Sequence, residues 1–438
     1  MSSSTMRWWV AVDLIEKILS AGNAKADEVE IYLSTGRSVT ARLKRREISY
    51  AAGSDNKSLA IRVISGGKIG VSSTSNPGRW EPCLDAALRS AQLANAQEWK
   101  GLPRPDPAGG GWINFDQTLI PDPARAGGLL QDMVEGAGAY PVEITSGSAE
   151  ISRFSTVLAN TNGLFREDRE SLVSIGLEAI REQSTGYEFE TSWKADIDAV
   201  EVGRRAAFLA SSSAGGRDIP TGTYDVILSP VALAQLVEAC IIPALSGRNV
   251  HEGRSRLAPL LGEEVFDPAL TLTDDPFHPR GTGSCLWDGE GSVTRRLPFI
   301  ERGVLRCFAY DLKTAYRYGK ESTGSAVRSG MGGGISIGVH CATLDGPRCN
   351  LADEEGIWVH DVVGAHTANP LTGDFSVELS NAFLTRGGHF EYPIKSAMLT
   401  GNVFEMLKGT EGISREERVV GAFVLPSIRL KNQRIIGN

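Results

Sequence analysis

The first hundred residues change their apolar spacing twice. Apolar side chains recur at helical spacing in residues 10–21, at Val10, Leu14, Ile15, Ile18 and Leu19. Strand-like alternation follows over residues 27–49 and 58–75, where Gly36 and the Gly66-Gly67 pair are the expected turns. Helical spacing returns in residues 80–96. The order of helix, strands and helix predicts an α+β amino-terminal domain.

Residues 101–112 are rich in proline and glycine and predict a loop inside this domain. A further helix is expected near residues 121–136, and strands over residues 139–180. Small, flexible residues then cluster in residues 211–222, just before a new strand. We therefore place the domain boundary there, with an amino-terminal α+β domain in residues 1–215 and a second domain in residues 222–438.

The second half of the chain is dominated by short apolar runs between turns. Residues 223–247 predict a strand and then a helix that begins at Ser229-Pro230 and ends at Gly247. Strand-like segments follow at residues 356–365, 373–388 and 421–430. These patterns predict a mostly β carboxy-terminal domain, and hence a two-domain α+β protein.

Composition narrows the function classes. The 438 residues are 41% hydrophobic and 22% charged, which is typical of a folded, water-soluble protein. A net charge of −8 argues against nucleic-acid binding, and we interpret the basic run Lys44-Arg45-Arg46 as solvated surface. Six scattered cysteines without a CxxC pair indicate reduced thiols. We expect a cytoplasmic protein, because no segment matches a signal peptide or reaches membrane-spanning length.

The pair His251-Glu252 resembles the start of a zinc-binding helix. A second ligand one turn later would be Ser255 or Arg256, and a guanidinium cannot coordinate a cation. The pair also follows the expected helix end at Gly247. We interpret it as loop rather than metal site.

Other chemistry-bearing residues form weaker patterns. The best remaining cation cluster is His360, His366, Asp361 and Asp374, but its spacing matches no known metal motif. Cys341 and Cys349 are expected to be unremarkable thiols in a hairpin, and no cysteine has the neighbouring histidine that a cysteine peptidase needs. Residues 330–338 lack the Lys-Ser/Thr ending of a phosphate-binding loop, so a loop or strand entry that a peptide can approach is expected.

Three segments, residues 219–239, 371–394 and 421–430, resemble the TldD/PmbA family, once called modulators of DNA gyrase. The order of elements matches over nearly the whole chain. The resemblance implies one of two branches. In the TldD branch a His-Glu-x-x-x-His helix and a distant cysteine bind zinc in a metallopeptidase; the PmbA branch, also called TldE, lacks those ligands and pairs with TldD.

The counterpart of the metal helix in this chain identifies the branch. The first histidine position falls on Val237, the glutamate on Glu238 and the second histidine on Ile242. The segment that carries the TldD cysteine corresponds to residues 387–402, which contain no cysteine. Valine and isoleucine have no atom that can bind zinc. The chain therefore resembles the PmbA/TldE branch, with no cofactor of its own and with zinc expected in a TldD-like partner.

The resemblance implies a non-catalytic subunit that forms a dimer with a TldD-like zinc metallopeptidase and helps it cut unfolded peptides. Strand addition is one way to hold such a peptide, and we expect Gly373, Asp374, Phe375 and Ser376 to contact peptide or partner. Two alternatives stay open. One is a self-sufficient hydrolase with a site around His360, His366 and Asp374, and the other is a homodimeric peptide-binding or scaffold protein.

Overall fold

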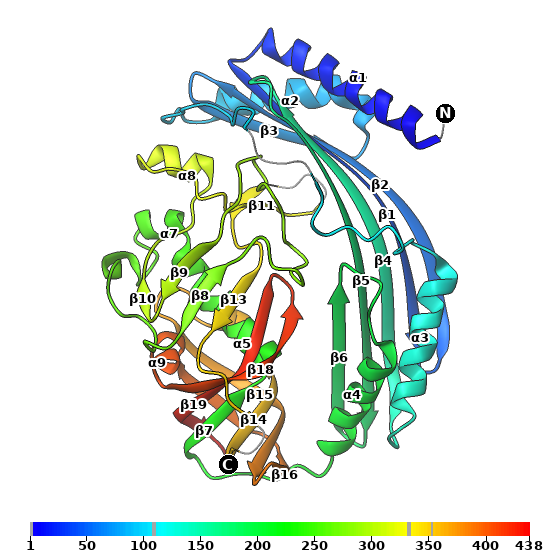
Figure 1. Cartoon of the computed structure of the whole chain (residues 1–438), viewed down its shortest axis with the longest axis vertical. Coiled ribbons are helices and arrows are strands. Elements are labelled where there is room, and N and C mark those ends of the chain that lie inside the picture. The colour runs from blue at the N-terminus through cyan, green and yellow to red at the C-terminus, as the bar shows by residue number, and fades with distance from the viewer. Residues whose placement is uncertain (1–2, 107–110, 331–333, 352–353) are drawn as a thin grey trace.

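A long curved sheet and a compact β region face each other in the structure, a computed structural model that describes residues 3–106, 111–330, 334–351 and 354–438. The curved sheet is built from the first half of the chain, and the β region from the second half (Figure 1). The α+β fold with a β-rich carboxy-terminal part is therefore confirmed.

The curved sheet has six antiparallel strands in the order β3-β2-β1-β4-β5-β6. The strands are β1 (Glu28–Lys44), β2 (Glu47–Ser65), β3 (Lys68–Thr74), β4 (Glu143–Asn160), β5 (Phe165–Arg181) and β6 (Ser184–Ser192). The helices are α1 (Ser3–Asn23), α2 (Trp80–Leu93), α3 (Pro123–Ala137) and α4 (Ala199–Ser212). Helices α1 and α2 pack on one end of the outer face, and α3 and α4 on the other end.

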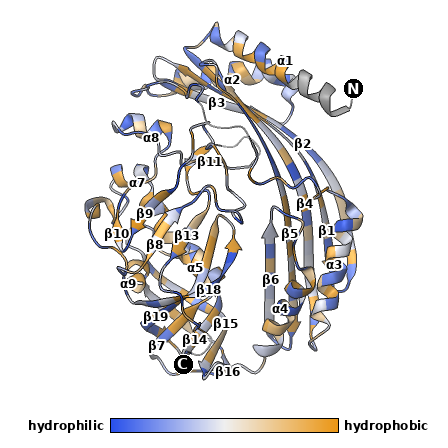
Figure 2. Ribbon diagram, in the orientation of Figure 1, coloured by the Kyte–Doolittle hydropathy of each residue, from blue (hydrophilic) through white to orange (hydrophobic). Residues whose placement is uncertain are grey.

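These four helices carry hydrophilic as well as hydrophobic residues, as expected of helices that cover one face of a sheet (Figure 2). Small residues let α3 and α4 approach closely. A Cβ atom on Gly203 would lie 1.9 Å from the Met133 carbonyl oxygen, and one on Gly136 would lie 1.9 Å from the Val200 carbonyl oxygen. A larger side chain at either glycine would force the helices apart.

The prediction of a turn at Gly36 is wrong. Strand β1 passes through Gly36 without a break and pairs there with Asn56 on one side and Phe154 on the other. A Cβ atom at this position would lie 2.2 Å from the Phe154 ring, so the glycine makes room for an aromatic side chain. The turn at Gly66 and Gly67 is confirmed, because both have a left-handed backbone, with φ of 55° and 73°.

The carboxy-terminal β region contains an eleven-stranded mixed sheet, part of which closes on itself. Strands β19, β17, β15, β14 and β7 are joined in a ring, since β19 pairs with both β17 and β7. The strands of this half, which include the separate β11–β12 pair, are β7 (Gly222–Leu228), β8 (Thr271–Asp274), β9 (Leu297–Glu301), β10 (Val304–Leu305), β11 (Ala326–Arg328), β12 (Ile335–Ile337), β13 (Ala342–Asp345), β14 (Gly356–Val363), β15 (Asp374–Arg386), β16 (His389–Ile394), β17 (Met398–Asn402), β18 (Thr410–Val420) and β19 (Phe423–Ile436). The helices are α5 (Pro230–Leu236), α6 (Ile242–Leu245), α7 (Gly247–His251), α8 (Leu312–Arg317) and α9 (Val403–Lys408).

Two loops predicted from glycine content lie partly outside the described residues. Residues 107–110 of the predicted loop 101–112 and residues 331–333 of the predicted loop 330–338 are outside the described ranges. Residues 335–337 of the second loop form β12, which pairs with β11, so the expected strand entry is confirmed there. Within the described ranges, no helix is long and apolar enough to cross a membrane.

Buried ion pairs join the two halves of the molecule. The Arg62 side chain on β2 bonds to Glu30 of β1 at 2.5 Å and to Glu290 from the carboxy-terminal half. Arg328 of β11 bonds to the second oxygen of Glu30 at 2.6 Å. All four side chains are at most 6% exposed. This cluster fixes the curved sheet against the β region at the end near α2.

Candidate functional site

The helix that carries Val237, Glu238 and Ile242, the counterparts of the zinc motif, contains a wide turn. Ser229 caps α5 by accepting hydrogen bonds from the Val231 and Ala232 amides, so the predicted Ser-Pro helix start is confirmed. Residues Val237–Ile241 then form a π-helical turn, in which the Ile242 amide donates to the Val237 carbonyl. Because this bond spans five residues, it brings positions five apart toward one side of the helix. That is the spacing between Val237 and Ile242.

The side chains at these positions do not fit a zinc ion. Val237 is 3% exposed and packs in the core, whereas Glu238 and the half-buried Ile242 line a cavity of about 340 Å³. Zinc needs nitrogen, sulfur or carboxylate ligands, and only Glu238 offers one. Residues 387–402, which form β16 and β17, contain no cysteine. Across the described ranges, no group of three His, Cys, Asp or Glu residues is placed to hold a metal ion.

The predicted end of this helix at Gly247 is wrong. The helix ends at Leu245, and Gly247 begins the short helix α7. A Cβ atom on Gly247 would lie 2.3 Å from the Tyr310 ring, so only glycine fits there.

The predicted loop is correct for Glu252 and the residues after it but wrong for His251, where a short helix ends. His251 is the last residue of α7, and its ring stacks on Tyr318 with centroids 4.1 Å apart. Its Nε2 atom lies 3.2 Å from the Tyr310 hydroxyl, and Glu252 pairs with Arg248 and Arg254. The interactions of His251 and Glu252 with these neighbours stabilise the local structure.

The cluster of His360, His366, Asp361 and Asp374 does not form a metal site. His360 is buried beside Glu188 of the curved sheet. Asp361 accepts a hydrogen bond from Gln235, and Asp374 accepts from Asn402 and Thr372. Because His360, Asp361 and Asp374 bind different partners, these residues do not meet at one site although they are close in sequence.

Strand β15 does not offer the free edge that strand addition needs. It lies between β14 on one side and β16 and β17 on the other. Phe375 is buried in the core, and the positive φ of Gly373, 82°, lets the chain turn against Phe404. A role of residues 373–376 in contacting a partner stays a prediction.

The structure places a cysteine beside a histidine that sequence reasoning did not connect. The Cys285 Sγ atom lies 3.4 Å from His340 Nδ1, and His340 Nε2 lies 2.8 Å from the Gly324 carbonyl oxygen. Burial, with Asp288 and other nearby carboxylates, raises the pKa of the Cys285 thiol well above 9. The thiol therefore stays protonated, unlike the thiolate of a cysteine peptidase. Cys341 and Cys349 are free, as expected, but the predicted hairpin between them is wrong, because β13 pairs with β8 and β19 and the Cys349 amide bonds to the Ile413 carbonyl.

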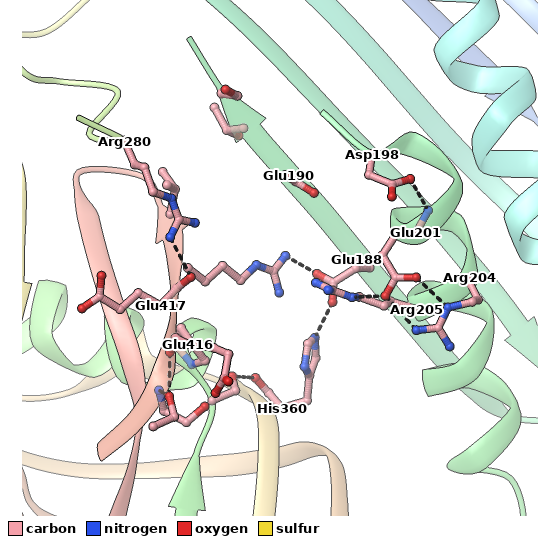
Figure 3. A pocket seen from close by; sticks show the side chains of 18 of the residues that line it. Glu188, Glu190, Asp198, Glu201, Arg204, Arg205, Arg280, His360, Glu416 and Glu417 are labelled. Atoms are coloured by element: carbon pink, nitrogen blue, oxygen red, sulfur yellow. Dashed lines mark hydrogen bonds and ion pairs between the residues drawn. The ribbon is translucent and has the colours of Figure 1, made fainter. Parts of the chain in front are cut away.

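A cavity of about 870 Å³ lies between the two halves of the molecule (Figure 3). We call it the interdomain cleft. One wall is formed by β6 and α4, and the other by β14, β16, β18 and the Pro279-Arg280 segment. The charged residues that line it are Glu188, Glu190, Lys194, Asp196, Asp198, Glu201, Arg204, Arg205, Arg280, His360, Glu416, Glu417 and Arg418.

A buried carboxylate connects the two walls of the cleft. The Glu188 side chain of β6 is 3% exposed and accepts a hydrogen bond from Arg418 of β18. Its other oxygen lies 3.7 Å from His360 Nε2 on β14. Arg418 also donates to the Phe189 carbonyl oxygen. The two charges stabilise each other, and they tie the edge of the curved sheet to the carboxy-terminal half.

His360 is expected to make the protein less stable in mild acid. Burial lowers the pKa of His360, with Arg418 adding to the effect and Glu188 opposing it. Because the unfolded chain takes up the proton near pH 6.5 and the folded chain resists it, stability falls as the pH drops from 7 to 5. Denaturant unfolding across this range should show a shallower fall for His360→Gln, which retains no titratable group.

Helix α4 organises the charges of the opposite wall. Asp198 caps its first turn by accepting a hydrogen bond from the Glu201 amide at 3.0 Å. The Glu201 carboxylate binds Arg204 and Arg205, and the hydrogen bond from Arg204 is the main reason its pKa falls to about 2. Glu201 therefore stays ionised, and its single negative charge is shared between the two guanidinium groups.

Comparison with known proteins identifies the family. Models of PmbA/TldA metallopeptidase domain 1, central domain and C-terminal domain match residues 29–92, 119–214 and 221–437. An uncharacterised protein of Methanocaldococcus jannaschii is 29% identical over 96% of this chain and 99% of its own. A metalloprotease PmbA homologue of Haemophilus influenzae is 25% identical over 98% of this chain and 96% of its own.

The fold comparison agrees with these matches. The crystal structure of TldE from Thermococcus kodakarensis superimposes with a TM-score of 0.91 at 26% identity, and the match covers 97% of this chain and 100% of that one. The chain therefore belongs to the PmbA/TldD family of peptidase-related proteins.

Proposed function

We propose that the chain is a non-catalytic, TldE/PmbA-like subunit that pairs with a TldD-like zinc metallopeptidase in the proteolysis of unfolded peptides. The observation that carries the proposal is the pair of apolar side chains at Val237 and Ile242, which lie with Glu238 on a helix that contains a π-helical turn. A glutamate without metal-bound water cannot perform the hydrolysis that zinc supports in a metallopeptidase.

The interdomain cleft gives such a subunit a place for peptide. Its volume of about 870 Å³ accommodates several residues of an extended chain, and both halves of the molecule contribute to its walls. The likeness to a solved TldE supports the pairing, because the two branches of this family differ in the ligands this chain lacks. Six free cysteines suit a reducing compartment, and we place the activity in the cytoplasm.

The test is reconstitution with a TldD-like chain from the same source. We expect the isolated protein to bind less than a tenth of an equivalent of zinc and to leave an unfolded casein fragment uncut. Mixing with the partner should produce cleavage that a chelator abolishes. The Glu238→Gln variant should change the rate of the mixture less than twofold, since the neighbouring ligand positions are the apolar Val237 and Ile242.

Two results would contradict the proposal. Stoichiometric zinc in the isolated chain, together with unaided cleavage, would indicate a self-sufficient hydrolase. Failure to co-purify with the TldD-like chain, with peptide bound by a homodimer, would indicate a scaffold protein.

A further inference from the structure

The arginines that line the interdomain cleft all have partners within the described ranges. Arg204 and Arg205 bind Glu201, and Arg418 binds Glu188 and the Phe189 carbonyl oxygen. Arg280 donates to the Glu417 carbonyl oxygen at 3.1 Å. The guanidinium groups of the walls therefore already bond to groups of the protein itself.

Glu190 contributes a carboxylate to the same cleft. It lies on β6, two residues beyond Glu188, and is half-buried (Figure 3). Throughout the described residues, no hydrogen bond or ion pair reaches its carboxylate. Burial raises the pKa of Glu190, although the nearby guanidiniums of Arg205 and Arg418 oppose the rise. A ligand can therefore supply the cation that pairs with the ionised Glu190 carboxylate.

Aromatic rings line the same cavity in a continuous series. Tyr140 and Phe208 have ring centroids 5.8 Å apart, Phe208 and Phe390 6.1 Å, and Phe390 and Trp358 5.2 Å. Phe390 is 40% exposed although it contacts three other rings, those of Phe208, Trp358 and Phe383. Such a surface suits the methylene stem of a long side chain.

We propose that the interdomain cleft recognises a basic side chain, lysine or arginine, of a bound peptide. The charged head pairs with Glu190, and the aliphatic stem lies along the rings of Phe208, Phe390 and Trp358. Lysine and arginine fit this lining because each joins an aliphatic stem to a terminal cation. The inference rests on the proposed function only in taking an unfolded peptide as the ligand.

Binding of this kind depends on pH in a defined direction. A bound cation stabilises the ionised form of Glu190 and therefore lowers its pKa, which opposes the effect of burial. At a pH where the Glu190 carboxyl is partly protonated, peptide binding therefore releases a proton from it. The preference for a basic residue strengthens as the pH rises through the raised pKa of the free protein.

The experiment measures peptide binding to the isolated full chain by fluorescence anisotropy. The probes are two labelled decapeptides of glycine, serine and alanine, identical except for a central lysine or norleucine, which share the same stem. We expect the lysine peptide to bind about tenfold more tightly, as a charged hydrogen bond in a partly desolvated site provides. In Glu190→Gln the two peptides should bind within twofold of each other.

A matched control removes the same charge elsewhere. Glu182 is exposed at the turn that precedes β6, and Glu182→Gln should keep the tenfold preference. Equal binding of both peptides to the unaltered protein, no binding of either, or an unchanged preference in Glu190→Gln would each overturn the inference. Because no partner or zinc is present, these outcomes are independent of whether reconstituted cleavage fails.

Discussion

Replacing Arg62 by alanine is expected to lower the free energy of unfolding by about 3–5 kcal/mol. The guanidinium is 6% exposed and bonds to two carboxylates, Glu30 and Glu290, that are almost completely buried. Without it, Glu290 loses its cation, although its second oxygen still accepts from the Leu312 amide. Glu30 then keeps its bond to Arg328, but the two buried carboxylates lose the cation that bridges them. Urea unfolding at pH 7 measures the loss.

The control for Arg62 is an ion pair of the same type on the surface. Arg306 and Glu301 are about half exposed and lie 3.1 Å apart, so Arg306→Ala should cost less than about 1 kcal/mol. Because the Arg62 cluster joins the two halves, its loss should also separate their unfolding transitions. A single transition with a loss no larger than that of Arg306→Ala would show that the cluster does not hold the halves together.

The second large effect is a reversal in the pH dependence of stability after Arg418→Ala. The substitution leaves the Glu188 carboxylate buried without its guanidinium and should destabilise the protein by about 3 kcal/mol at pH 8. The cation that remains within reach is the imidazolium of His360, 3.7 Å away. We therefore expect the pKa of His360 to rise above its unfolded value near 6.5. The variant then regains stability as the pH falls from 7 to 5, whereas the unaltered protein loses it.

Two further variants check the cause of this reversal. Arg418→Lys keeps the positive charge but loses the planar fork, so a smaller loss with the original sign of the pH dependence is expected. The double substitution Arg418→Ala, His360→Gln should abolish the gain at low pH. If the gain persists in the double variant, another group is responsible.

Local periodicity was a good guide to the helices and to the β-rich character of the second half. The spacing around Ile15 and Ile18 identified α1, and the Ser229-Pro230 start of α5 was correct because a cap depends only on neighbouring residues. Gly36 shows the limit of this reasoning. Glycine signals a turn in sequence, but here it accommodates a ring from residue 154 of another strand.

Sequence likewise predicted some features of the candidate site and not others. The apolar residues at Val237 and Ile242 could be found from sequence, since ligand chemistry is a property of the side chain alone. The Cys285–His340 pair and the interdomain cleft could not, because Glu188, His360 and Arg418 come from three distant segments. Neither spacing nor composition indicates which of many carboxylates is buried, or which arginine neutralises it.

The sequence by itself thus determined the family resemblance, the α+β class and the loss of the zinc ligands, because each depends on residue identity in a short segment. Only the tertiary structure decided that β15 lies inside a sheet and that β6 lines a cleft. It also decided that Glu190 lines this cleft, where no hydrogen bond or ion pair from the described residues reaches its carboxylate. These features depend on long-range pairing of the two halves of the chain. The burial that results from this pairing sets the charge state and the availability of each group.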